Sequence, residues 1–114
     1  MHKFDLNNRT AIITGGAQGF GLDIAKRFLK SGAKAIIWDI DENELIKASK
    51  ELNSSNLSYH VVDVSNFKNV KETTEEITKS SNIDILINNA GITGSTSALW
   101  DYDVDEWNKL FKLT

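Results

Sequence analysis

The chain has 114 residues, enough for one domain, and its 40% hydrophobic and 25% charged residues are typical of a folded globular protein. A formal net charge of −3 without a cluster of lysine and arginine argues against nucleic acid as a partner, and no apolar run is long enough to span a membrane. The absence of cysteine excludes a disulfide framework, a thiolate zinc site and a catalytic thiol. Because no apolar signal segment follows Met1, we expect a cytoplasmic protein.

Four short apolar runs predict buried strands because they are rich in isoleucine, valine and aromatic residues. The runs recur at a constant spacing along the chain, over residues 11–13, 35–38, 59–62 and 83–87. The segments between them carry apolar residues at helical spacing, which predicts helices over 21–31, 42–52 and 66–79, followed by a fourth helix from Asp103. Strands that alternate with helices predict a parallel sheet built from βαβ units.

Polar and small residues at the ends of these segments predict where the helices begin and end. Gly32 is placed to end the first helix, and Asp41 with Glu44 forms a capping-box pattern at the start of the second. Ser65 is predicted to cap the third helix. Tyr59 lies inside the third predicted strand, where we expect it to pack in the core.

Each apolar run is followed by or ends on a polar side chain, and these are Thr14, Asp39, Asp63 and Asn88. Because ligands bind beyond the carboxyl ends of the strands in an open parallel sheet, these residues predict one ligand-binding edge. For Asp63 the alternative is a surface acid after a strand, and for Asn88 it is an asparagine that only forms a turn.

A glycine-rich segment over residues 14–21, Thr-Gly-Gly-Ala-Gln-Gly-Phe-Gly, joins the first strand to the first helix. Glycines in such a turn let the backbone approach a pyrophosphate, and the N-terminus of the following helix attracts the anion. An isolated match of this kind is as often a plain turn between a strand and a helix. Here Asp39 closes the next strand, where a carboxylate accepts hydrogen bonds from ribose hydroxyls, and this context favours a dinucleotide site.

The sequence resembles the short-chain dehydrogenase/reductase family over roughly residues 5–114. The spacing Thr-Gly-x-x-x-Gly-x-Gly is similar to that family's coenzyme turn, Asp63-Val64 to its adenine-contacting pair, and residues 88–91, Asn-Asn-Ala-Gly, to its second signature. The resemblance implies a doubly wound parallel sheet of the Rossmann type with helices on both faces. We therefore expect a single NAD-binding domain over 1–114 that holds the first four strands, in the order 3-2-1-4, and lacks the C-terminal part of the fold.

The resemblance also implies a cofactor site made from the glycine-rich turn and from residues that follow the second, third and fourth strands. Asp39 would bind the adenosine ribose, Asp63 would meet the adenine amino group, and Asn89 would mainly tie the fourth strand to its neighbours. The full set of residues implied in cofactor binding is Gly15, Gln18, Gly19, Phe20, Gly21, Asp39, Ile40, Asp63, Val64, Asn89, Ala90 and Gly91.

The acid–base pair of that family, a tyrosine followed four residues later by a lysine, is absent from this sequence. Tyr59 is followed at that spacing by Asp63, and Tyr102 by Glu106. A further active-site asparagine of the family falls on Thr114. We therefore assign no catalytic residue and no metal ligand to this chain, and we expect it to show no turnover by itself.

The resemblance thus implies the NAD-binding part of an oxidoreductase that moves hydride between a nicotinamide cofactor and a small-molecule alcohol or carbonyl substrate. NAD is expected rather than NADP because Asp39 would repel a 2′-phosphate. We expect the intact enzyme to be a homo-oligomer through its last predicted helix, and this chain to be its N-terminal portion. The alternative is a complete, non-catalytic module that binds a dinucleotide or pairs with a partner subunit.

Overall fold

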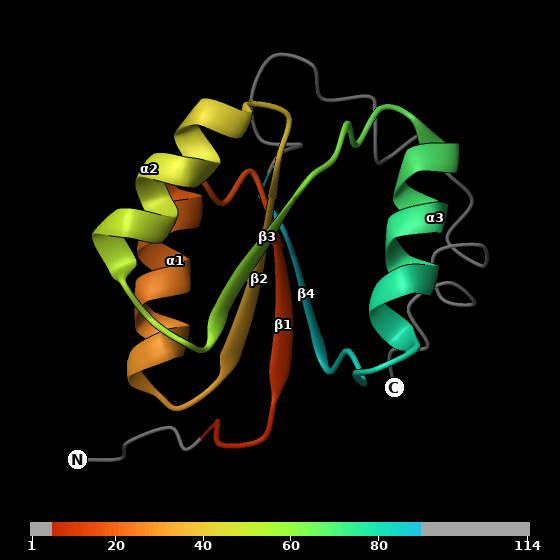
Figure 1. Ribbon diagram of the computed structural model, residues 1–114. Helices are drawn as coiled ribbons and strands as arrows, with labels where there is room; N and C mark the ends of the chain where they lie inside the picture. The colour runs from red at the N-terminus through yellow and green to blue at the C-terminus, as the bar shows by residue number, and fades with distance from the viewer. Residues whose placement is uncertain (1–5, 90–114) are drawn as a thin grey trace.

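The computed structural model describes residues 6–89, in which strands and helices alternate along the chain. The elements are β1 (Thr10–Thr14), α1 (Gly19–Lys30), β2 (Lys34–Asp39), α2 (Glu42–Leu52), β3 (Leu57–Val61), α3 (Phe67–Thr78) and β4 (Ile85–Asn88). The strands form one parallel sheet in the predicted order β3-β2-β1-β4. Figure 1 shows α1 and α2 on one face of this sheet and α3 on the other. The predicted doubly wound, Rossmann-type fold is therefore confirmed.

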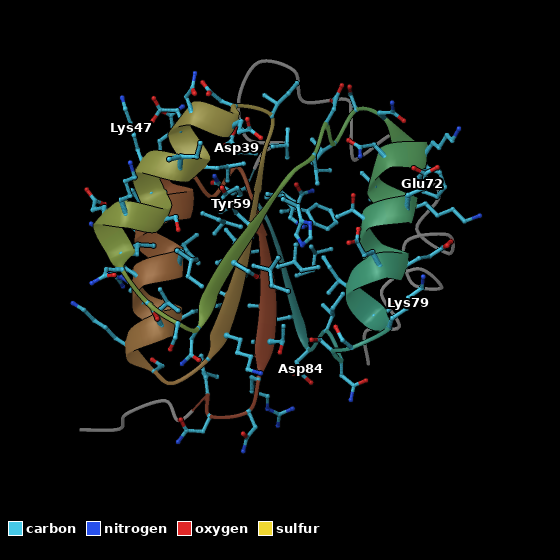
Figure 2. All side chains as sticks on the ribbon, in the orientation of Figure 1. Asp39, Lys47, Tyr59, Glu72, Lys79 and Asp84 are labelled. Atoms are coloured by element: carbon cyan, nitrogen blue, oxygen red, sulfur yellow. The ribbon has the colours of Figure 1, made fainter. Side chains whose placement is uncertain are left out.

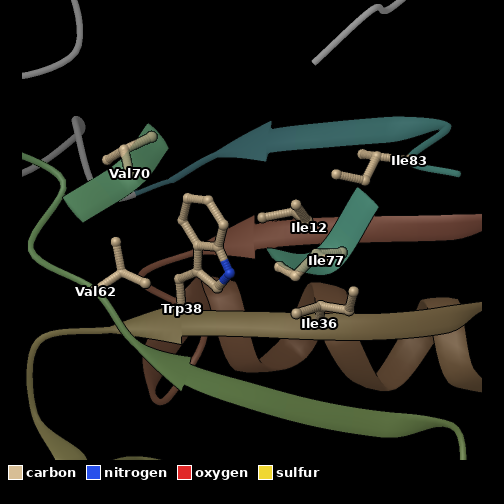
Figure 3. Close-up of a cluster of buried hydrophobic side chains, with 7 residues drawn as sticks. All are labelled: Ile12, Ile36, Trp38, Val62, Val70, Ile77 and Ile83. Atoms are coloured by element: carbon tan, nitrogen blue, oxygen red, sulfur yellow. The ribbon is translucent and has the colours of Figure 1, made fainter. Parts of the chain in front are cut away.

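Side chains of the central strands alternate between the two faces of the sheet and form two cores. The core under α3 consists of Ile12, Ile36, Trp38, Val62, Val70, Ile77 and Ile83 (Figure 3). The core under α1 and α2 consists of Ile13, Ala17, Ala25, Ala35, Ile37, Leu45 and Ala48. Because both faces of β1 and β2 are covered, these strands read in the sequence as continuous apolar runs.

Asp84 fastens the beginning of β4 to the beginning of β1. Its carboxylate accepts a hydrogen bond from the Thr10 backbone N–H at 2.9 Å, and its own N–H donates to the Thr10 carbonyl at 2.9 Å. The Arg9 guanidinium lies 3.6 Å from the same carboxylate. Directly after these contacts β4 covers Ile85–Asn88, so it begins and ends later than the predicted run of 83–87.

Two of the predicted helix ends are confirmed. Gly32 follows α1 with a φ of +90°, which a residue with a side chain rarely adopts, and its N–H donates to the Leu29 carbonyl at 3.1 Å. Asp41 caps α2, because its side chain accepts a hydrogen bond from the Glu44 N–H at 3.2 Å.

The predicted cap of α3 is wrong by one residue. Asn66, and not Ser65, caps this helix by accepting a hydrogen bond from the Asn69 N–H at 3.1 Å. The Ser65 hydroxyl donates instead to the carboxylate of Asp63. Both residue types are good N-caps, so the choice depends on a contact that the local pattern does not reveal.

The third strand is an outer strand of the described sheet, and this position exposes part of it. Tyr59, predicted to pack in the core, is 36% exposed, because a strand at the end of a sheet has a neighbour on one side only. The fourth helix, predicted from Asp103, lies outside the described residues. Within 6–89, no helix has the length and apolar character needed to cross a membrane.

Candidate nucleotide-binding site

The carboxyl ends of the strands bring the predicted polar residues to one edge of the sheet. Thr14 and Asn88 are partners across β1 and β4, and the Thr14 hydroxyl lies within 3.4 Å of the Asn88 side-chain oxygen. The N–H of Val62, next to Asp63, donates to the Asp39 carbonyl at 3.0 Å. Figure 2 shows Asp39 at this edge and Asp84 at the opposite end of the sheet. Asn88 therefore links two strands, which is more than the turn-forming role left open by the sequence.

The turn between β1 and α1 requires glycine at several positions for different reasons. Gly15 and Gly19 have φ values of +64° and +61°, in the left-handed region that other residues rarely adopt. A Cβ added to Gly21 would meet the Gly15 carbonyl group and lie 2.9 Å from the Asn89 side-chain nitrogen. The turn therefore runs unusually close to the start of α1.

Gly16 also belongs to this turn, although it is not among the residues that the sequence implies in cofactor binding. A Cβ added there would lie 2.7 Å from the Cβ of Ile37, and the Gly16 N–H donates to the Trp38 carbonyl at 3.1 Å. Both contacts are to β2, so the turn lies directly on the neighbouring strand. The spacing of glycines contains no signal for this contact, since it depends on the register between strands.

The N-terminus of α1 differs from those of the other two described helices. Gln18 occupies the N-cap position with no side-chain hydrogen bond, whereas Asp41 and Asn66 cap α2 and α3. The first turn of α1, like that of α3, contains no acidic residue. Its first backbone N–H groups have no partner within the helix, and they carry the positive end of the helix dipole. An anion placed here would supply the missing acceptors.

The Asp39 carboxylate is held in place by backbone groups on two sides. One oxygen lies 3.4 Å from the N–H of Ala17 in the glycine-rich turn, and the other accepts from the N–H of Asp41 at 3.1 Å. These contacts join the end of β2 to the turn after β1. Asp39 is half-buried, so part of the carboxylate is open to a ligand.

Asp63 follows β3 and is held by the turn that leads into α3. Its backbone N–H donates to the Asn69 side-chain oxygen at 2.8 Å, and one carboxylate oxygen accepts from the Ser65 N–H at 2.9 Å. Val64, the next residue, is partly buried against the core under α3. The bonds to Ser65 and Asn69 make Asp63 part of an ordered turn at the carboxyl edge of the sheet.

Two exposed apolar side chains lie beside these polar groups in the sequence. Phe20, in the first turn of α1, is 78% exposed, and Ile40, directly after Asp39, is 67% exposed. Exposed apolar groups next to an uncapped helix and an ordered acid are suited to the flat faces of a bound base or ring.

Asn89 ties the fourth strand to the glycine-rich turn, as the family resemblance implied. Its side-chain nitrogen donates to the Gly15 carbonyl at 3.2 Å. Because that carbonyl also faces Gly21, the end of β4, the turn and the start of α1 meet at one point. Ala90 and Gly91, which were also predicted to line the site, lie outside the described residues.

Comparisons with known proteins agree with this geometry. The family model described as short chain dehydrogenase matches residues 9–114. The chain is 36% identical to 3beta-hydroxysteroid dehydrogenase 2 of Eggerthella lenta over 98% of its own length and 44% of that protein. It is 39% identical to 3-oxoacyl-(acyl-carrier-protein) reductase FabG of Rickettsia prowazekii over 89% of this chain and 40% of that one.

A solved structure of 3-ketoacyl-(acyl-carrier-protein) reductase from Brucella melitensis, complexed with NADH, is also similar. It has a TM-score of 0.65 and 34% identity, over 71% of this chain and 33% of that one. The chain spans less than half the length of the curated relatives described above, at 44% and 40%. The match over 9–114 nevertheless includes nearly the whole chain. The chain therefore belongs to the short-chain dehydrogenase family, whose members are oxidoreductases with a fold that binds nicotinamide dinucleotides.

Proposed function

We propose that this chain binds NAD for an oxidoreductase that transfers hydride between the cofactor and a small-molecule alcohol or carbonyl compound. The observation that carries the proposal is the uncapped N-terminus of α1, which adjoins a turn where added side chains would collide with backbone. A pyrophosphate is an anion that accepts several backbone hydrogen bonds and needs such a close approach. The backbone N–H groups at the start of α1 and the absence of side chains at the glycines therefore suit the pyrophosphate of the cofactor.

The residues of this chain would hold the cofactor along the carboxyl edge of the sheet. Gly19, Phe20 and Gly21 would offer their N–H groups to the pyrophosphate. Asp39 would accept hydrogen bonds from the ribose hydroxyls, and Asp63 from the adenine amino group. When bound, the nicotinamide supplies the hydride chemistry, and the protein supplies position and electrostatics.

We propose NAD rather than NADP as the cofactor. A 2′-phosphate would lie against the Asp39 carboxylate, and bringing two anions together out of water is costly. Gln18 and Ile40, which flank the site in the sequence, carry no positive charge to offset that repulsion. Both oxygens of Asp39 already contact backbone N–H groups, so the carboxylate is not free to turn away.

The proton transfer that accompanies hydride transfer needs groups beyond those described here. The sequence contains no tyrosine followed four residues later by lysine, so we propose that residues outside this chain supply the acid–base chemistry. The same proposal includes a cytoplasmic enzyme that forms homo-oligomers. These two properties rest on the family to which the chain belongs.

Calorimetric titration of the natural full-length protein with NAD and with NADP tests this proposal. We expect tighter binding of NAD, and for Asp39→Ala a loss of NAD affinity on the order of tenfold, since a hydrogen bond to a charged group is removed. The ratio of the affinity for NAD to the affinity for NADP should be smaller in Asp39→Ala than in the unmodified protein. Glu76→Ala removes one exposed negative charge from α3 on the other face of the sheet and serves as the matched control. Tighter binding of NADP by the unmodified protein would contradict the proposal.

A further inference from the structure

In the turn between β3 and α3, four hydrogen bonds involve Asp63, and one of them runs from the Asn66 N–H to the Asp63 carbonyl at 3.0 Å. The N–H and the hydroxyl of Ser65 both donate to the same oxygen of the Asp63 carboxylate, Oδ1, at 2.9 and 2.5 Å. The N–H of Asp63 donates to the Asn69 side-chain oxygen at 2.8 Å. Asp63 is therefore held at its carboxylate by Ser65 and at its backbone by Asn66 and Asn69.

The two carboxylate oxygens of Asp63 differ in the number of hydrogen bonds that they accept. Oδ1 has two donors from Ser65, whereas no hydrogen bond reaches Oδ2 from any residue within 6–89. A carboxylate with one oxygen bound twice loses most of its freedom to rotate, so Oδ2 keeps one direction. An acceptor with a fixed direction binds a donor without a further loss of side-chain entropy.

The second anchor connects Asp63 to the body of α3. Asn69 lies in the first turn of that helix, and its own N–H is bonded to the Asn66 side chain at 3.1 Å. The neighbouring residues Val62 and Val70 are both fully buried in the core under α3. Because α3 is packed against the sheet, the hydrogen bond from the Asp63 N–H to Asn69 fixes the Asp63 backbone relative to that helix.

We propose that Ser65 and Asn69 are positioning residues that hold Oδ2 of Asp63 ready for the exocyclic amino group of adenine. The inference rests on the proposed function, because it takes a bound adenine dinucleotide as its ligand. Ser65 and Asn69 would act only through Asp63, without contacting the cofactor. Ser65 orients the Asp63 carboxylate, and Asn69 holds the Asp63 backbone in place at the edge of the sheet.

A purely structural role for these residues makes a different prediction. If Ser65 and Asn69 only stabilise the turn, their loss lowers stability and weakens all dinucleotides alike. If they present Oδ2 to the amino group, their loss weakens the preference for a base that carries this group. The discriminating quantity is thus a ratio of two affinities, which a general loss of stability does not change.

The ratio is measured with NAD and nicotinamide hypoxanthine dinucleotide, whose base carries an oxygen in place of the amino group. Titrations use the natural full-length protein and its variants Ser65→Ala, Asn69→Ala and Ser65→Thr. We expect the unmodified protein to prefer NAD by about tenfold, the value of one hydrogen bond to a charged acceptor. Ser65→Ala and Asn69→Ala should each reduce this preference to about threefold or less, while Ser65→Thr, which keeps the hydroxyl, retains it.

Ile77→Val is the matched control, because it weakens the packing of the same helix near its other end, away from Asp63. It should lower stability by roughly 1 kcal/mol, a fivefold change in the folding equilibrium, and leave the affinity ratio unchanged. If Asn69→Ala does not fold, the exposed Ser65→Ala variant decides the question alone.

An unchanged tenfold preference in both alanine variants would overturn the inference. If the unmodified protein binds NAD without preferring it to the hypoxanthine analogue, the inference fails and the proposed function stands. If it binds neither dinucleotide, the proposed function fails as well. These results are therefore distinguishable from one another.

Discussion

Replacing Gly21 with alanine tests how closely α1 must approach the glycine-rich turn. An added Cβ would lie 2.8 Å from the Gly15 carbonyl carbon and 2.9 Å from the Asn89 side-chain nitrogen, and it would also meet the Gly15 oxygen. Real Cβ atoms essentially never come closer than 3.0 Å to such neighbours. The nearest obstacle is backbone at the end of a buried strand, so the helix and the turn must separate.

The expected cost follows from two opposing effects. Overpacking of a buried site costs about 1–3 kcal/mol, and a backbone obstacle places Gly21→Ala at the upper end of that range. Alanine is a better helix former than glycine by about 1 kcal/mol, which offsets part of this cost. We therefore expect a net loss of about 2 kcal/mol in the free energy of unfolding, although helix propensity alone predicts a gain.

Urea unfolding of the natural full-length protein measures this change, and Asp23→Ala provides the control. Asp23 is exposed and lies on the same helix, so its replacement should change the free energy of unfolding by less than about 0.5 kcal/mol. NAD affinity should also fall in Gly21→Ala, because the N–H groups of the first turn are displaced. A variant as stable as the unmodified protein, or more stable, would refute the reasoning from this contact.

Three other predictions concern contacts elsewhere in the described residues. Asp84→Ala removes the acceptor of the buried Thr10 N–H, and urea unfolding should show a loss of about 1–3 kcal/mol; an unchanged value would mean that this bond does not fasten β4. Asp39→Ala should speed hydrogen exchange at the Ala17 amide without cofactor, and an exchange rate equal to that of the unmodified protein would contradict the link across the turn. Lys26→Ala breaks an ion pair with α2 in which both side chains are partly exposed, and a change larger than about 1 kcal/mol in unfolding would be unexpected.

The order and type of the elements were predictable because each strand is short, apolar and separated by a helical pattern. Burial on both faces makes β1 and β2 read as unbroken apolar runs, and the constant spacing gives the βαβ repeat. The site residues that follow from local chemistry, such as Asp39 at the end of a strand, could be placed in the same way. The family resemblance supplied the proposed role of Asp63 and the structural role of Asn89, which local chemistry alone does not give.

Features that depend on contacts between distant segments were not predictable. Gly16 needs glycine because Ile37 lies against it, and this follows from the register of β1 and β2. The exposure of Tyr59 depends on the place of β3 at the end of the sheet. The choice of Asn66 over Ser65 as a cap depends on Asp63, which engages the serine hydroxyl. In each case the sequence pattern permits two outcomes, and tertiary structure selects one.

The central claim is that the N-terminus of α1 receives the pyrophosphate of NAD while Asp39 binds the adenosine ribose. A crystal structure of the natural full-length protein with NAD tests it most directly. We expect the pyrophosphate oxygens to accept hydrogen bonds from the N–H groups of Gly19, Phe20 and Gly21, and the ribose hydroxyls to contact the Asp39 carboxylate. NAD bound with its pyrophosphate away from this turn, or with its ribose away from Asp39, would contradict the account.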